Sequence, residues 1–119
     1  MKVKISFDAQ ENKDILSTAI EQGSVYWMQD YIVVCKRDAE SYVESFSIRE
    51  RENSDEREIS KRGKNVVEIS SLANALNLLN TLDGYERVKS DILKNKSGCD
   101  AESADVLVQL EIFGEVIYG

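Results

Sequence analysis

The sequence contains no histidine and only two cysteines among its 119 residues. Without histidine the chain lacks the most common general base and the most common ligand of transition metals, and a Ser-His-Asp triad is excluded. Cys35 and Cys99 are too few for a four-ligand zinc site and form no Cys-x-x-Cys redox motif. One disulfide remains open, but two free, buried thiols in a cytoplasmic protein are the stronger expectation.

Signals for membranes, nucleic acids and phosphates are also missing. The first residues, MKVKISFD, alternate charged and apolar side chains, unlike a signal peptide, and no apolar run approaches the roughly 18 residues of a membrane span. The net charge of −7 argues against sequence-independent nucleic-acid binding, which needs a basic surface. Glycine-rich phosphate loops and EF-hand spacing are absent. We therefore expect a soluble cytoplasmic protein without cofactor, metal, membrane or direct nucleic-acid contacts.

The length fits one domain over residues 1–119, and an apolar fraction of 42% suffices for one core. Apolar side chains alternate at the start of the chain, as in a half-buried strand. Asp8 and Glu11 then have the spacing of a capping box, ahead of an apolar helical stripe that Gly23 ends. These patterns predict a strand at 2–7, a helix at 9–22, one bent or two short strands at 25–37, and strands at 42–50 and 65–69.

Three helices are expected after the last strand. Leucines at helical spacing predict the first, which Asp83-Gly84 ends, and the second follows from Tyr85. Asp100 caps the third, which is apolar on more than one side and so largely buried until Gly114 ends it. The order β-α-β-β-(β)-β-α-α-α predicts an α+β fold, an antiparallel sheet of about four to five strands with helices packed on one face.

Residues 49–64 mix basic and acidic side chains in one hydrophilic stretch. Such a composition predicts a solvated loop or hairpin tip. An arm that binds a partner protein is the alternative, and Arg57, Lys61 and Arg62 are its candidate contact residues.

Tyr26, Trp27 and Tyr31 concentrate aromatic side chains in one stretch. They are candidates to stack on a base or a nucleotide ring, although a place in the core is the stronger expectation. Because successive strand residues face opposite ways, Tyr26 and Trp27 cannot both be buried in one layer. One of the two is expected to face helices or something outside the chain.

Asp100, Glu102 and Asp105 gather where the last helix is expected to begin. Hard carboxylate oxygens suit magnesium or calcium, so these residues are the candidates for a metal-dependent enzyme. Capping of the helix and compensation of its positive end explain the same residues without a metal, and we prefer that interpretation. We therefore expect no catalysis.

The block ILSTAIEQGSVYWM at 15–28 and the tail DAESADVLVQLEIFGEVIYG at 100–119 resemble small proteins encoded by phages, prophages and other mobile elements. In those proteins a helix ends in a turn followed by a Tyr-Trp pair, here Tyr26-Trp27. Their chains close with a helix of Asp-Ala-Glu-x-x-Asp-x-x-x-Gln type and a Phe-Gly-Glu-x-x-Tyr-Gly end. The resemblance covers about a third of the chain and implies a mobile-element origin, not a mechanism.

The tail also carries a physical signal. Gln109 lies in an otherwise apolar helix, so its amide needs hydrogen-bonding partners or solvent. Phe113, Val116, Ile117 and Tyr118 lie near the end of the sequence, where large apolar groups gain nothing if the chain frays. We expect the tail to dock against the chain's own sheet or against a second subunit. The apolar tail and an unguarded sheet edge both favour a homodimer.

These observations favour a non-enzymatic accessory protein that binds a host protein in the cytoplasm of a bacterial host. By analogy with other small acidic phage proteins it would inhibit a host defence complex, as anti-CRISPR proteins do. An acidic helical surface with Asp83, Glu86 and Asp91 is the candidate contact. The alternatives are a protein that binds or sequesters a nucleotide and a protein of purely structural role.

Overall fold

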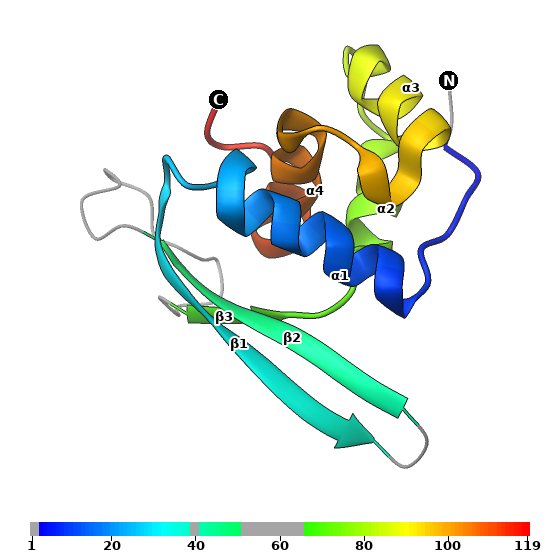
Figure 1. Ribbon diagram of the computed structural model, residues 1–119. Helices are drawn as coiled ribbons and strands as arrows, with labels where there is room; N and C mark the ends of the chain where they lie inside the picture. The colour runs from blue at the N-terminus through cyan, green and yellow to red at the C-terminus, as the bar shows by residue number, and fades with distance from the viewer. Residues whose placement is uncertain (1–2, 39–40, 51–65) are drawn as a thin grey trace.

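The computed structural model describes residues 3–38, 41–50 and 66–119, in which helices lie on one side of a three-stranded antiparallel sheet (Figure 1). In chain order the elements are α1 (Ala9–Thr18), the π-helical turn η1 (Ala19–Gly23), β1 (Met28–Asp38), β2 (Ser41–Glu50), β3 (Val66–Ile69), α2 (Ala73–Leu79), α3 (Glu86–Asn95), the 3-10 turn η2 (Lys96–Gly98) and α4 (Ala101–Phe113). The α+β class and the antiparallel sheet are confirmed, with three strands in the described part of the chain instead of four or five.

The strand predicted at 2–7 is wrong, because residues 3–8 form no strand. The Val3 N–H donates to Asn80 Oδ1 (2.6 Å), and Asn80 Nδ2 donates to the Val3 carbonyl oxygen (3.0 Å). A side-chain amide thus provides the hydrogen bonds that a neighbouring strand would provide. Ile5 and Phe7 pack against the core while Lys4 and Ser6 are exposed, so the alternation reports burial against helices and not a sheet.

The predicted first helix is confirmed, including its capping box. The Glu11 N–H donates to Asp8 Oδ1 (2.8 Å), and the Asp8 N–H donates to Glu11 Oε1 (3.0 Å). The structural requirement for glycine at position 23 differs from the helix stop that the sequence indicated. Gly23 does not adopt a left-handed conformation, but a Cβ at this position would lie 2.2 Å from the carbonyl oxygen of Ala101, at the start of α4. Glycine is needed here for a close approach between two helices.

The hairpin expected around 37–41 joins β1 and β2, and the bend near residues 29–30 corresponds to a register shift between Met28 and Asp30. Val33 of β1 pairs with Phe46 of β2, and Tyr31 pairs with Ile48. Phe46 and Ile48 are buried under the helices. β2 is the middle strand, so β1 and β3 are the two edges of the sheet, and the hairpin extends beyond the helical layer (Figure 1).

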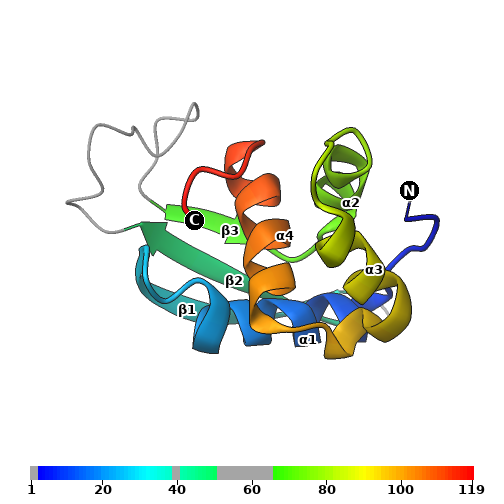
Figure 2. The same cartoon turned by 90° about the horizontal axis from the view of Figure 1, so that it is seen from above.

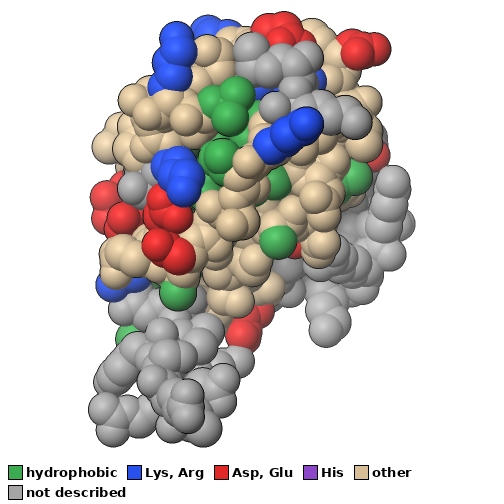
Figure 3. All heavy atoms as spheres, turned by 90° about the vertical axis from the view of Figure 1, so that its right-hand side faces the viewer, with side chains coloured by type: hydrophobic (Ala, Val, Ile, Leu, Met, Phe, Trp, Pro, Cys, Tyr) green, Lys and Arg blue, Asp and Glu red, His purple; other side chains and the backbone are tan. Residues whose placement is uncertain are grey.

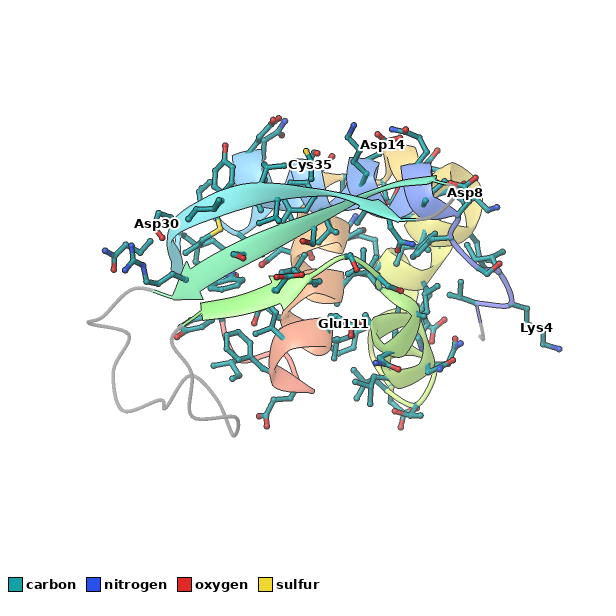
Figure 4. The ribbon with its side chains drawn as sticks, turned by 90° about the horizontal axis from the view of Figure 1, so that it is seen from below. Lys4, Asp8, Asp14, Asp30, Cys35 and Glu111 are labelled. Carbon is teal, nitrogen blue, oxygen red and sulfur yellow. The ribbon has the colours of Figure 1, made fainter. Side chains whose placement is uncertain are left out.

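α4 is the central helix, as its apolar composition predicted, and it contacts α1, α2, α3 and β3 (Figure 2). It also binds the start of α2, because Glu111 Oε1 accepts a hydrogen bond from the Ala75 N–H (3.1 Å). Figure 4 shows Glu111 between the two helices. Both ends of α4 are as expected, since Asp100 caps its N-terminus and Gly114 ends it in a left-handed conformation.

Three further expectations have mixed outcomes. Both cysteines are free, but only Cys99 is buried, and Cys35 is exposed on β1. Among the described helices, none has the length and apolarity to cross a membrane. Of the mixed-charge segment, residues 49–50 end β2, and the rest lies outside the described residues, including Arg57, Lys61 and Arg62.

Candidate ligand-binding site

Asp105 is the centre of a hydrogen-bond network that joins α4 to the turn before β1. Asp105 Oδ1 accepts hydrogen bonds from Ser24 Oγ and Trp27 Nε1, both at 2.8 Å. Asp105 Oδ2 accepts from the Tyr26 hydroxyl (2.6 Å) and from Gln109 Nε2 (3.0 Å). Four donors occupy the acceptor capacity of one buried carboxylate, so both of its oxygens are fully hydrogen-bonded in a largely apolar helix.

Gln109 extends this network to the end of the chain. Its Oε1 accepts hydrogen bonds from the Ile117 and Tyr118 N–H groups, both at 2.8 Å, and its Nε2 donates to the Tyr118 carbonyl oxygen (3.0 Å). The amide therefore receives the partners that its position in an apolar helix required. The tail docks on its own chain, and it does so against α4 and not against the sheet.

Aromatic rings complete the anchor of the tail. Tyr118 stacks on Trp27 with ring centroids 5.6 Å apart, and the Phe113 ring contacts both in edge-to-face geometry at 6.0 Å and 5.5 Å. Trp27 is 2% exposed, whereas Tyr26 is 50% exposed. One of the two aromatic neighbours thus faces the core and the other faces outward, as expected, although both precede β1 and lie in a turn.

A cavity of about 670 Å³ lies beside this network. Three tyrosines line it, Tyr26, Tyr85 and Tyr118, together with the carboxylates Glu102 and Asp105. The remaining wall consists of Gly23, Val106, Val116 and Gly119. Its size is that of a site for a small molecule.

The acidic side chains of the cavity wall are those of Glu102 and Asp105. In the described part of the chain no lysine or arginine lines it, and Glu102 contributes an exposed carboxylate. Arg87 Nη2 pairs with Glu102 Oε2 at 2.8 Å, and Arg87 Nη1 pairs with Asp100 Oδ2 at 2.9 Å, so one guanidinium is shared by two acids. The charged side chains of the cavity wall are therefore carboxylates, and Glu102 already has Arg87 as a partner just outside the wall.

The Tyr26 hydroxyl is held in its neutral form. Burial of its hydroxyl end raises the pKa of Tyr26 above the usual tyrosine value, and the hydrogen bond to the Asp105 carboxylate and its charge raise it further. The hydroxyl proton is directed at Asp105, so the Tyr26 hydroxyl serves as a donor to the carboxylate of its own chain.

Of the three aromatic residues predicted to bind a ligand, one lines the cavity. Tyr26 lines the cavity, whereas Trp27 is buried behind Tyr118 and belongs to the core. Tyr31 lies on β1, 42% exposed, and does not line the cavity.

The carboxylates at the start of α4 do not converge on a metal. Asp100 accepts from the Ser103 N–H, Glu102 pairs with Arg87, and Asp105 points into the network described above. No group of three or more Cys, Asp or Glu side chains suited to a metal ion occurs among residues 3–38, 41–50 and 66–119. Capping accounts for Asp100, as preferred from the sequence.

The acidic residues predicted to contact a partner divide into two kinds. Asp83 is exposed in the turn before α3, and Glu86 is exposed at the start of α3, where its Oε1 lies 3.8 Å from Lys89 Nζ. Asp91 instead binds within the chain, because its Oδ2 accepts from the Asp100 N–H (2.9 Å) and from Ser103 Oγ (2.7 Å). The side on which α3 lies in Figure 1 displays both acidic and basic side chains (Figure 3), so it is not uniformly acidic.

Several residues of this site carried little signal in the sequence. Ser24 is a single small residue in a turn, and Tyr85 fitted the apolar stripe of a helix. By contrast, Tyr26, Trp27 and the tail had been singled out by the resemblance to phage-encoded proteins, and the structure brings them together around Asp105 and Gln109.

Comparison of the sequence with models of protein families gave no match, and comparison with curated proteins and with solved structures gave no significant match. The resemblance to phage-encoded proteins therefore stays a prediction, and the geometry of the site is the remaining basis for a function.

Proposed function

We propose that this chain is a non-enzymatic binding protein whose cavity holds a small organic cation. The observation that carries the proposal is the composition of the cavity wall. Among its described residues are three tyrosines and the exposed carboxylate of Glu102, which pairs with Arg87, but no lysine or arginine. Aromatic rings attract cations through the negative face of the ring, and cages of aromatic side chains bind quaternary ammonium groups.

The same wall makes a phosphorylated ligand less suitable. A nucleotide brings phosphate charges that need arginine, lysine or a free helix N-terminus, and none of these lines the cavity among the described residues. Of the two ligand classes considered, the amine therefore fits the charge of the site and the nucleotide does not.

Absence of catalysis is part of this proposal. Asp105, the most buried carboxylate of the site, already accepts four hydrogen bonds from its own chain. A general base must have a free lone pair within reach of the proton that it takes. Asp105 is therefore better suited to fix the cavity wall than to take part in a reaction.

The test is a titration with choline and with its neutral isostere 3,3-dimethyl-1-butanol, followed by calorimetry and by the fluorescence of Trp27. Choline should bind about fivefold more tightly than the isostere, since a cation–π contact contributes on the order of 1 kcal/mol. Glu102→Gln and Tyr85→Ala should weaken choline binding, while Tyr31→Ala, outside the cavity, should not. Equal affinity for both compounds, or binding of AMP with neither, would overturn the proposal.

A second candidate is the binding of a host protein in the bacterial cytoplasm, with inhibition of a defence complex as its outcome. The exposed carboxylates of Asp83 and Glu86 support it, together with the resemblance to phage-encoded proteins. Replacing both with Asn and Gln should weaken capture of a stoichiometric host protein and reduce its salt dependence. Unchanged capture at low salt would remove the acidic contact from this candidate.

A further inference from the structure

The outer edge of β1 is the longest unpaired edge of the sheet that the described residues form. β1 runs from Met28 to Asp38, with β2 on one side and no described strand on the other. At its centre three consecutive apolar side chains are exposed, Tyr31 by 42%, Ile32 by 66% and Val33 by 44%. Proteins normally protect a long apolar edge, because its free N–H and C=O groups pair readily with another strand.

We infer that β1 pairs in antiparallel orientation with β1 of a second copy, about a two-fold axis at Val33. The pairing would join two three-stranded sheets into one continuous sheet. Both copies would contribute the same strand, which is the arrangement of a closed two-fold dimer. This surface does not include the cavity, so the inference is independent of the proposed ligand.

The apolar run of β1 selects the second copy and the register. Residues 31–35 are all apolar, and Val33 is the centre of this run. With the axis at Val33, Ile32 lies opposite Val34 and Tyr31 opposite Cys35, so each side chain of the run meets another apolar side chain. Asp30, next to the run, pairs with Arg49 of β2 and takes no part in this contact.

The neighbouring registers lack this complementarity. An axis at Val34 would place Tyr31 and Ile32 opposite residues beyond the apolar run, and an axis at Ile32 would place two polar residues, Gln29 and Asp30, opposite the run. The strand thus complements itself best about Val33.

The side chains on the two faces of β1 agree with such a pairing. Tyr31 and Val33 lie on the same face as their partners Ile48 and Phe46, which is the helix-covered face. In a dimer these side chains would meet their counterparts beside the two cores. Ile32, on the opposite face, would lie next to Val34 of the second copy and lose part of its exposure.

The two-fold axis fixes distances that can be measured. The two Val33 residues would be directly opposite each other, with Cα atoms about 4.5–5.5 Å apart. That separation allows a disulfide. The two Cys35 residues would be displaced by four positions along the strands, about 13 Å, which is too far for one.

The first experiment is sedimentation equilibrium of the full chain over a range of concentrations. The wild-type protein should form a dimer, and Ile32→Lys should weaken it by at least about tenfold, because a lysine would meet an apolar neighbour at the interface. Ile32 is exposed, so circular dichroism of the variant should match the wild type. A wild-type protein that stays monomeric at all concentrations would overturn the inference.

Cysteine cross-linking tests the register. Val33→Cys in a Cys35→Ser background should form a covalent dimer on mild oxidation. Ile32→Cys in the same background should not, because the two positions would be offset by two residues along the strands. Wild-type Cys35 should also remain uncoupled. Efficient coupling of the wild-type protein or of the Ile32→Cys variant, with none of the Val33→Cys variant, would overturn the pairing about Val33.

Discussion

The rings of Trp27 and Tyr118 stack in parallel, with centroids 5.6 Å apart and an interplanar angle of 5°. The contact joins the turn after the first helix to the last residues of the sequence. Because the indole N–H of Trp27 donates to Asp105, ring stacking and hydrogen bonding fix the same side chain from two directions. The wall of the cavity depends on this anchor, since Tyr118 belongs to both.

Tyr118→Ala should destabilise the fold by about 2 kcal/mol, because an aromatic pair and its buried area are lost. Trp27 should become accessible to water, so its fluorescence emission should shift to longer wavelength. Urea unfolding followed by circular dichroism measures the first effect, and the emission spectrum measures the second. Tyr118→Phe keeps the ring and should lose less than half as much stability. Equal losses for both variants would contradict a role for stacking.

Asp105→Asn should cost about 3 kcal/mol of unfolding free energy, since bonds to a charged acceptor are lost and an amide N–H₂ faces donors. Ser24 and Trp27 already share Oδ1, so an amide N–H₂ in place of Oδ2 would face the donors of Tyr26 and Gln109. The control is Asp83→Asn, which changes an exposed carboxylate. Urea titration measures the free energy of unfolding of both variants, and only Asp105→Asn should lower it. If both variants unfold at the same urea concentration as the wild type, the network does not stabilise the fold.

Gly23→Ala should destabilise the protein by about 2–3 kcal/mol, because the new methyl group meets backbone that cannot move cheaply. The nearest atom would be the Ala101 carbonyl oxygen at 2.2 Å. Gly98→Ala is the matched control, since nothing lies within 4 Å of a Cβ at that position. Thermal melts of the two variants provide the comparison. Equal melting temperatures would show that α4 does not approach the first helix this closely.

The two cysteines should differ in reactivity. Burial above all, with the charges of Asp91 and Asp100, raises the pKa of the Cys99 thiol to about 12, so it has almost no thiolate at neutral pH. Cys35 is exposed. A disulfide reagent at pH 8 should modify one thiol per native chain and two in guanidinium chloride. Cys35→Ser should abolish the native reaction. Rapid modification of Cys99 in that variant would contradict its burial.

Acid should destabilise the junction of α3 and α4. The hydrogen bond from the Ser103 N–H and the Arg87 guanidinium lower the pKa of Asp100. Burial opposes ionisation of Asp91, but hydrogen bonds from Asp100, Ser103 and Asn95 outweigh it and lower the pKa of Asp91.

Both folded pKa values lie below the unfolded value of about 3.9, so the stabilisation is complete above that pH and is lost as pH falls through the folded values. The urea midpoint should be level from pH 7 to 5 and decline below about pH 4. Asp91→Asn should lower the midpoint at pH 7 and flatten the decline. A decline as steep as that of the wild type would exclude Asp91 as a contributor.

Local signals were sufficient for much of the fold. The capping box of Asp8 and Glu11, the cap at Asp100 and the left-handed end at Gly114 are properties of short segments, and each is present. The β1–β2 hairpin and its bend likewise follow from local composition. These features depend on neighbours within a few residues, which the sequence displays directly.

Sequence patterns that indicate burial did not show which part of the chain covers the buried residues. Residues 3–7 alternate as a strand would, yet Val3 is held by the Asn80 side chain and no strand lies beside it among the described residues. Gly23 looked like a helix stop, but its role is the approach of Ala101. Alternation or a glycine indicates a constraint, while the source of the constraint lies far away in the chain.

The candidate site also combines features that the sequence indicated with features that depend on the fold. The sequence by itself determined that the chain lacks histidine, that α4 is apolar enough to be central, and that Gln109 and the tail need partners. Only the tertiary structure decided that Asp105, Ser24, Trp27 and Tyr118 share one network, and that Tyr26 and Tyr85 line one cavity. The reason is that a periodic pattern records whether each side chain is buried or exposed. A site instead depends on which elements, far apart in the sequence, pack together.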